Sequence, residues 1–193
     1  MSISHLWGFY FNPRQQWHNL QQKHSSLVES ISHLSFFSAI APCCLALSMW
    51  FFGIEWSEKT RFIQPLQIIG IATCMYLSII TAVILLAFLA RAMTKDYGKP
   101  ASIDLAMELA CNTVTPLLCT GFAWLFPEGW FLLLVGLLGL IYSIYLLFLG
   151  TPILLEIPDE RGFMFSTTLV TVGLVLLALL FFANAFVWMW VLR

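Results

Sequence analysis

The chain has 193 residues, of which 60% are hydrophobic and 10% are charged, and its formal net charge is -1. Soluble domains contain roughly 45–50% apolar and about 25% charged residues, so a single soluble core could not bury this apolar excess. The near-neutral charge argues against a nucleic-acid partner, because such a surface needs a dense basic patch. The composition therefore predicts a membrane protein.

The N-terminal segment, residues 1–33, is predicted to be cytoplasmic and amphipathic. Asn12 and Pro13 suit the start of a helix, and the apolar residues behind them recur at spacings of three and four, which places them on one face: Trp17, Leu20, His24, Leu27, Ile31 and Leu34. This stripe predicts a helix on the membrane surface or packed under the bundle; the alternative is a docking element for a soluble partner. Polar sequence runs to His33, so no signal peptide is expected and the first span is expected to be retained.

Five stretches are long and apolar enough to cross a hydrocarbon core of about 30 Å, which takes about 20 helical residues. They cover residues 34–54, 62–90, 103–126, 129–155 and 163–192, and residues 34–193 are thus predicted to form one transmembrane domain. The short connections, including 91–100, make sequential spans antiparallel neighbours. The predicted fold is an all-α polytopic membrane bundle of five transmembrane helices, preceded by an N-terminal amphipathic helix.

The basic residues predict the orientation of this bundle. With the N-terminus inside, six of them fall in cytoplasmic segments and three on the far side. The positive-inside rule therefore predicts a cytoplasmic N-terminus and an external C-terminus.

Span three carries a polar face, whose members fall at helical spacing: Asp104, Glu108, Cys111, Asn112, Thr115 and Cys119. Such a face is costly against acyl chains, so it should point into the bundle or toward a water-filled cleft. Glu108 has two interpretations. It could exchange protons or hold a cation or a lipid amine, or it could snorkel or pair with a basic residue of the adjoining loop: Arg91, Lys95 or Lys99.

Pro116 lies in the middle of span three and has no N–H to donate, which leaves the Asn112 carbonyl without its helical partner. A kink is expected there, and the hydroxyls of Thr113 and Thr115 can repair the backbone locally. The alternative is a hinge or a binding pocket next to Asn112.

Span four presents Gly139 and Ser143 at a small-xxx-small spacing, which favours close helix packing. Tyr142 and Tyr145 flank this seam, where a phenol can bury its ring while its hydroxyl bonds across helices. In span five, Asn184 is expected to supply an interhelical hydrogen bond.

Catalytic motifs are missing from the sequence: it contains no Gly-rich phosphate loop, HExxH pair or G-x-S-x-G elbow. The five cysteines lack metal-ligand spacing and are interpreted as small apolar fillers, with a soft-metal site as the alternative. The four histidines fall between His5 and His33 without other ligands nearby. We therefore expect neither enzymatic activity nor a cofactor or metal.

Short motifs resemble those of a known family. The segment Thr115-Pro116-Leu117, followed by Tyr142-Ser-Ile-Tyr145-Leu-Leu-Phe-Leu-Gly150-Thr-Pro152, resembles the Yip domain family of five-span membrane proteins, and more closely its bacterial inner-membrane branch. The N-terminal Leu6-Trp7-Gly8 with a nearby Pro13 adds to the likeness. The resemblance implies an inner-membrane location, a cytoplasmic N-terminus and an external C-terminus.

Eukaryotic members of this family engage prenylated small GTPases and vesicle-trafficking partners, and often associate with one another. This chain departs from them in carrying Cys111 and Asn112 where members often have Gly-Tyr, and in lacking their long acidic N-terminal extension. These departures argue against a small GTPase partner here.

The sequence therefore predicts a non-enzymatic organiser of membrane proteins or lipids. Its partners would be membrane lipids, a second copy or another membrane protein, and its candidate contact residues are Glu108, Asn112, Thr115, Pro116, Tyr142, Tyr145, Gly150 and Pro152. The alternative is a small transporter or permeation pathway in which Glu108 and Asn112 bind solute or protons. A membrane-embedded lipid-modifying enzyme ranks third, because few acid–base or nucleophilic groups are available to converge.

Overall fold

The computed structural model describes residues 12–23, 26–56, 59–61, 64–97, 100–126 and 128–191. Its helices are α2 (Pro13–Lys23), α3 (Leu27–Ser38), α4 (Ile40–Phe52), α5 (Pro65–Tyr97), α6 (Ile103–Cys119), the 3₁₀-helix η1 (Thr120–Leu125), α7 (Gly129–Leu155) and α8 (Asp159–Val191). Five helical stretches are long and apolar enough to cross a membrane: Leu27–Phe52, Pro65–Tyr97, Ile103–Leu125, Gly129–Leu155 and Glu160–Val191. The predicted all-α bundle is confirmed. A short antiparallel hairpin, β1 (Ile54–Trp56) and β2 (Lys59–Arg61), joins α4 to α5.

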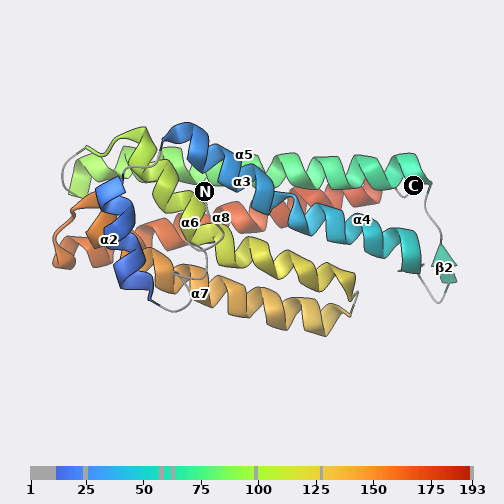
Figure 1. Cartoon of the computed structure of the whole chain (residues 1–193). Coiled ribbons are helices and arrows are strands. Elements are labelled where there is room, and N and C mark those ends of the chain that lie inside the picture. Colours follow the sequence, from blue (N-terminus) through green and yellow to red (C-terminus); the bar gives the residue numbers. More distant parts are fainter. Residues whose placement is uncertain are drawn as a thin grey trace.

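The long helices run alongside one another, and α2 lies across one end of the bundle (Figure 1). We call this the α2 end and the opposite one, which holds the hairpin, the hairpin end. The C-terminal end of α8 lies at the hairpin end, so α2 and the end of α8 are on opposite sides. Sequential spans are neighbours, as expected, and two further pairings close the bundle: α5 packs along α8, and α3 packs on α6.

Helix α5 extends beyond its predicted span, so the prediction of a loop over 91–100 is wrong for most of that stretch. The helix ends at Tyr97, where the Thr94 hydroxyl donates to the Arg91 carbonyl at 2.7 Å and accepts from the Ala101 N–H at 3.1 Å. The 33 residues of α5 span roughly 50 Å at about 1.5 Å per residue, which exceeds the hydrocarbon thickness. The charges beyond Ala90 mark where the bilayer would end, and the helix continues past that point.

The predicted single stripe over residues 17–34 is also wrong, because the segment forms two helices. The Ser26 hydroxyl accepts from the Glu29 N–H at 3.3 Å and caps the start of α3. Trp17 and Leu20 are buried, whereas Ile31 is 43% exposed, so α2 and α3 each bury a face of their own. His24 and the Leu6-Trp7-Gly8 motif lie outside the described residues.

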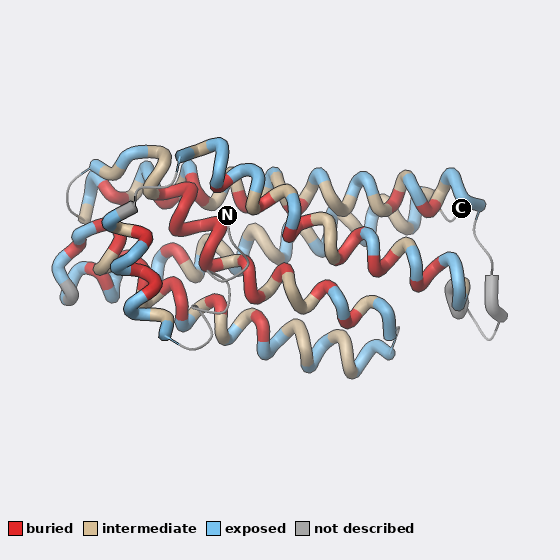
Figure 2. Tube along the Cα trace, in the orientation of Figure 1, coloured by how far each residue is buried: buried red, intermediate tan, exposed pale blue. Residues whose placement is uncertain are grey.

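Buried residues concentrate on α6 and at the α2 end (Figure 2). They form three apolar clusters along the bundle. The α2-end cluster includes Trp17, Ala90, Leu109, Leu146, Leu154 and Phe165. The middle cluster includes Leu34, Phe37, Val83, Cys111 and Leu118. The hairpin-end cluster consists of Leu45, Met49, Ile68 and Ile71, with Trp124 packed against it.

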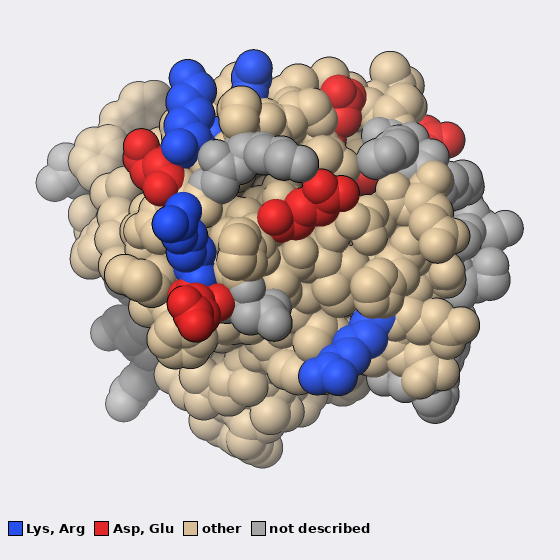
Figure 3. Space-filling model, turned by 90° about the vertical axis from the view of Figure 1, so that its left-hand side faces the viewer, with Lys and Arg blue, Asp and Glu red and all other residues tan. Residues whose placement is uncertain are grey.

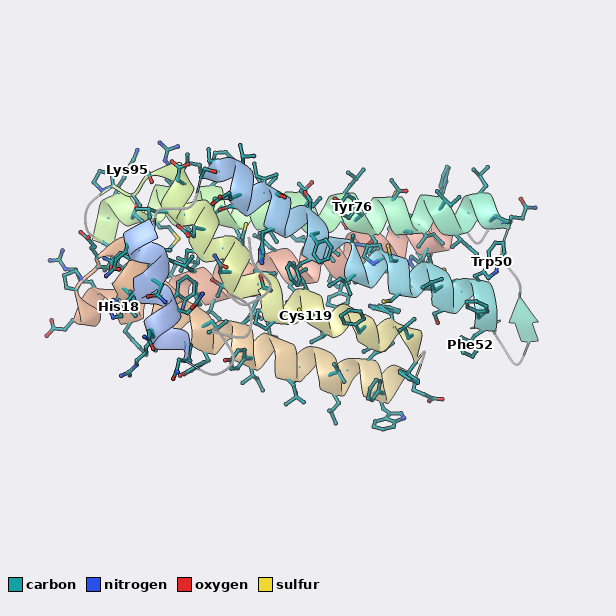
Figure 4. All side chains as sticks on the ribbon, in the orientation of Figure 1. His18, Trp50, Phe52, Tyr76, Lys95 and Cys119 are labelled. Atoms are coloured by element: carbon teal, nitrogen blue, oxygen red, sulfur yellow. The ribbon has the colours of Figure 1, made fainter. Side chains whose placement is uncertain are left out.

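Exposed aromatic side chains gather at the hairpin end, where Trp50 and Phe52 extend from the end of α4 (Figure 4). Trp130 at the start of α7 and Trp190 near the end of α8 are also exposed. Tryptophan favours the headgroup level, so this end is expected to meet one membrane interface. A path of about 30 Å along α7 from Trp130, at about 1.5 Å per residue, ends near Gly150, close to the level of α2.

Candidate functional site

The polar face of α6 points into the bundle. Glu108 is 1% exposed, Asn112 4% and Thr115 6%, and Pro116 is also buried. Helix α6 contacts α3, α5 and α7, so these side chains are surrounded by protein. The expected inward orientation of this face is confirmed for these three polar residues, while Asp104 and Cys119 at its two ends are half-buried.

Hydrogen bonds from this face return to the backbone of α6. The Asn112 side-chain amide donates to the Glu108 carbonyl at 2.8 Å, and the Thr115 hydroxyl donates to the Cys111 carbonyl at 2.7 Å. Thr113 donates in the same way to the Leu109 carbonyl. Such bonds satisfy buried donors and tend to bend a helix. The two threonine hydroxyls bond to the Leu109 and Cys111 carbonyls, whereas Pro116 deprives the Asn112 carbonyl, so repair of that carbonyl by these hydroxyls stays a prediction.

Glu108 does not snorkel, because both of its carboxylate oxygens are buried. The snorkelling part of that alternative is wrong, and pairing with a basic residue of the loop stays a prediction. Of the basic residues considered as partners, Arg91 and Lys95 are exposed, and Lys99 lies outside the described residues. A buried carboxyl group in a membrane bundle is costly, and it is therefore the polar group of α6 with the strongest claim to a function.

The seam between α6 and α7 is as tight as the small residues predict. A Cβ at Gly139 would collide with Thr120 Cγ2 and lie 3.3 Å from Leu117 Cα. Ser143, one turn further, is buried. Glycine is required at position 139 because the backbone of α7 approaches the junction of α6 and η1 at this point.

A second close contact joins α2 to α7. A Cβ at Gly150 would lie 2.6 Å from Trp17 Cε2, so the indole rests directly on the glycine. Trp17 is fully buried, and the Gln21 amide donates to the Glu156 carboxylate at 3.4 Å nearby. The apolar face of α2 is therefore occupied by α7, which is the packed-under-the-bundle alternative. The stripe in the sequence indicated that Trp17 is buried but gave no sign that Gly150 covers it.

Tyr142 and Tyr145 face different surroundings, although their ring centroids are only 5.8 Å apart. Tyr142 is half-buried and packs at the edge of the α2-end cluster. Tyr145 is 48% exposed on the outer surface of α7. Pro152 is half-buried one turn before the end of α7.

The eight predicted site residues thus do not converge on one point. Four belong to the buried polar face of α6: Glu108, Asn112, Thr115 and Pro116. Gly150 belongs to the α2 contact, and Tyr145 faces outward. The residue that sequence reasoning left out of the set is Trp17, which forms the largest part of that contact.

Charged side chains gather on the α2 end, which Figure 3 views face-on. Exposed residues of both signs are interspersed there: Arg14, Arg91, Lys95, Asp96, Glu156, Glu160 and Arg161. A mixed surface of this kind has no large field of one sign. Within the described part of the chain, no three His, Cys, Asp or Glu side chains are grouped so as to hold a metal ion.

Comparisons with known proteins agree with this architecture. The Yip1 domain model matches residues 7–180. The chain belongs to the Yip1 domain family. Two curated relatives, both named inner membrane protein YohC, come from two strains of Escherichia coli; each is 26% identical over 191 residues, covering 96% of this chain and 96% of the relative. No solved structure matches the chain.

This Yip1-family chain is accordingly an integral inner membrane protein. The family resemblance read from Thr115-Pro116-Leu117 and the Tyr142–Pro152 run is confirmed by the family match. Both motifs lie at close contacts or interruptions of the bundle: Pro116 precedes the change from α6 to η1, and Gly150 receives Trp17.

Proposed function

We propose that this protein is a non-enzymatic organiser of membrane proteins or lipids, which acts through the outer surface of its bundle. The observation that carries the proposal is the contrast between its inside and outside. The described polar hydroxyl and amide groups of α6 bond to their own backbone, whereas large apolar side chains are exposed along α7 and α8. Contacts with lipids, a second copy or another membrane protein would form on that exposed surface.

Tyr145 is the residue of the outer surface most suited to a specific contact. It is 48% exposed on the same face of α7 as the exposed apolar side chains of Ile141 and Leu138, which lie one and two turns before it. Counted from Trp130, it lies roughly 22 Å along the helix, at about 1.5 Å per residue, which is below the opposite interface. A phenol at this depth can bond to a lipid headgroup or to a neighbouring helix while its ring stays in the apolar region.

Native mass spectrometry from a mild detergent tests this proposal, because it reports bound lipids, copies and partners together. We expect the wild-type protein to retain lipid or a second membrane chain. Tyr145→Ala should lower the retained fraction about tenfold, the effect of losing about 1.4 kcal/mol. Phe88→Ala, which removes an exposed aromatic side chain from α5 and thus from outside the α7 and α8 surface, is the matched control and should leave retention unchanged. A strictly monomeric, lipid-free wild type would contradict the proposal.

The second candidate function is a small transporter or permeation pathway. It is favoured by the complete burial of the Glu108 carboxylate, since intramembrane carboxylates commonly mark ion or proton pathways. Flux into reconstituted vesicles would be compared for wild type and Glu108→Gln, with Glu128→Gln at the exposed start of α7 as the control. Flux that is lost only in Glu108→Gln supports transport, and unchanged flux removes Glu108 from any mechanism.

The proposed orientation places the α2 end in the cytoplasm and the hairpin end outside. It rests on the count of basic residues in the sequence and on the positive-inside rule. Labelling of single cysteines at Gln22 and Met189, both exposed, in a cysteine-free background tests it with a membrane-impermeant maleimide on intact spheroplasts. We expect label at Met189 alone; the reverse pattern would overturn the orientation.

A further inference from the structure

Two of the five spans are interrupted, and the other three are continuous helices. The first span changes from α3 to α4 at Ala39, and the third changes from α6 to η1 at Thr120. In contrast, α5, α7 and α8 run for 33, 27 and 33 residues. All of these helices lie within the described residues.

A proline accompanies each interruption. Pro42, in the first turn of α4, has no N–H to donate to the Ser38 carbonyl, and Pro116 deprives the Asn112 carbonyl in the same way. Ser38 is fully buried, and its hydroxyl has no hydrogen-bond partner within the described chain. After Pro116 the chain adopts a six-residue 3₁₀-helix, which is longer than the roughly three or four residues usual for such runs.

The two interruptions coincide in space. A Cβ at Gly121 would lie 2.7 Å from Ala41 Cα and 2.8 Å from Ala41 N, so the backbones of η1 and α4 touch. Ala41 is two residues from the first interruption, and Gly121 is one residue from the second. Figure 4 shows Cys119, at the end of α6, in the middle part of the bundle.

The packing of the core changes at the same level. Phe37 and Leu118 belong to the middle cluster, whereas Leu45 and Trp124 pack in the hairpin-end cluster. On the α2 side of the interruptions α3 packs on α6, and on the hairpin side α4 packs on η1. Each half of the interrupted spans therefore has its own partner and its own core.

We propose that the interruptions at Ala39 and Thr120 form one hinge, about which α4 and η1 move together relative to α3 and α6. The two helices stay in contact through Ala41 and Gly121 because their backbones touch there. The continuous helices α5 and α8 hold the two halves of the bundle together during the motion. This inference is independent of whether the protein organises partners or transports a solute.

Pairs of spin labels in nanodiscs test the hinge by electron–electron double resonance. The first pair, Ile31 with Leu47, spans the interruption between α3 and α4. The control pair, Ile69 with Leu85, has the same separation of 16 residues within continuous α5, and all four side chains are exposed. Both distances would be roughly 24 Å in straight helices, at about 1.5 Å per residue. Labels attached through genetically encoded handles leave the native cysteines in place.

We expect the Ile31–Leu47 distribution to be roughly twice as broad as that of Ile69–Leu85, as a bend that exchanges between conformations would produce. A third pair, Leu47 with Phe122, joins α4 to η1 at exposed positions and should be as narrow as the control. The double substitution Pro42→Ala and Pro116→Ala restores both donors and should narrow the first distribution to the width of the control.

Two results would overturn the proposal. A native Ile31–Leu47 distribution as narrow as that of Ile69–Leu85 would mean that no hinge exists at Ala39. A Leu47–Phe122 distribution as broad as that of Ile31–Leu47 would mean that α4 moves without η1. Both comparisons use the wild-type background, so they do not depend on the folding of the proline variants.

Discussion

Helices α6 and α8 differ greatly in the share of their residues that is buried. In an apolar 18-residue stretch of the α6–η1 span 67% of the residues are buried, whereas the corresponding stretch of α8 buries none. The α6–η1 span is also the least apolar of the five candidates. In a soluble protein the more apolar helix would be the inner one. In a bilayer the solvent is apolar, so the helix with polar side chains takes the centre.

The same comparison can be made between the two halves of α8, by replacing one phenylalanine in each. The substitution in the buried half should give the largest loss of stability predicted here. Phe165 is fully buried near the start of α8, with its ring 5.6 Å from that of Tyr97, and Phe182 is 76% exposed. Phe165→Ala should lower the free energy of unfolding by about 3 kcal/mol, through loss of packing and an empty cavity. Phe182→Ala should change it by less than about 0.5 kcal/mol. Unfolding by sodium dodecyl sulfate in mixed micelles measures both; equal effects would contradict the burial of the first half of α8.

Two glycines of α7 distinguish its protein-facing side from its lipid-facing side. Gly139→Ala places a Cβ against Thr120 and Leu117, whereas a Cβ at Gly136 meets nothing within 4 Å. We expect Gly139→Ala to destabilise the bundle by about 1–3 kcal/mol, as overpacking does. Gly136→Ala should be neutral or slightly stabilising, since alanine favours a helix. Thermal unfolding of the two variants in detergent measures both effects. A lower melting temperature for Gly136→Ala than for Gly139→Ala would mean that the α6–α7 seam is misplaced.

Asn184 tests one of two polar links described between the lipid-facing part of α8 and α5; in the other, the Gln67 amide donates to the Val191 carbonyl at 3.0 Å. The Asn184 amide donates to the Ser78 hydroxyl at 3.0 Å and to the Leu180 carbonyl at 2.8 Å. Asn184→Ala should cost about 0.6 kcal/mol, the average for such bonds in membranes. The Thr171 hydroxyl bonds only to the Thr167 carbonyl of its own helix among the described contacts, so Thr171→Val should have a smaller effect. A larger loss in Thr171→Val would mean that the interhelical bond adds nothing.

The smallest expected effect concerns the hydrogen bond between α2 and α7. The Gln21 amide lies 3.4 Å from the Glu156 carboxylate at an exposed position. Gln21→Ala should therefore change the free energy of unfolding by less than about 0.5 kcal/mol, and the α2 contact should depend instead on Trp17. Fluorescence of a dye at Asn19 would report release of α2. Release in Gln21→Ala would show that the polar bond holds the helix.

Much of the architecture was predictable because membrane helices are long and their apolar runs are unmistakable. The inward direction of Glu108, Asn112 and Thr115 followed from helical spacing and from the cost of placing them against acyl chains. The tight approach at Gly139 followed from its spacing with Ser143. These inferences depend on periodicity within one helix, which a sequence records directly.

Contacts between segments distant in the sequence could not be predicted in the same way. The stripe around Trp17 required burial, but nothing in the local pattern selected Gly150 as the covering residue. The separation of α2 from α3 could have been found, because Ser26 with Glu29 three residues later is a helix-start signal. The extension of α5 to Tyr97 was missed because charges mark the edge of a bilayer, whereas backbone hydrogen bonding decides where a helix ends.

The contact between the Trp17 indole and Gly150 couples two positions that are 133 residues apart. No side chain larger than hydrogen fits at position 150 while a tryptophan occupies position 17. A homologue that carries a bulkier residue at the second position must have a smaller one at the first, or must have lost the docked helix altogether. Correlated substitution of this pair across aligned sequences would thus identify the homologues in which α2 stays docked on α7.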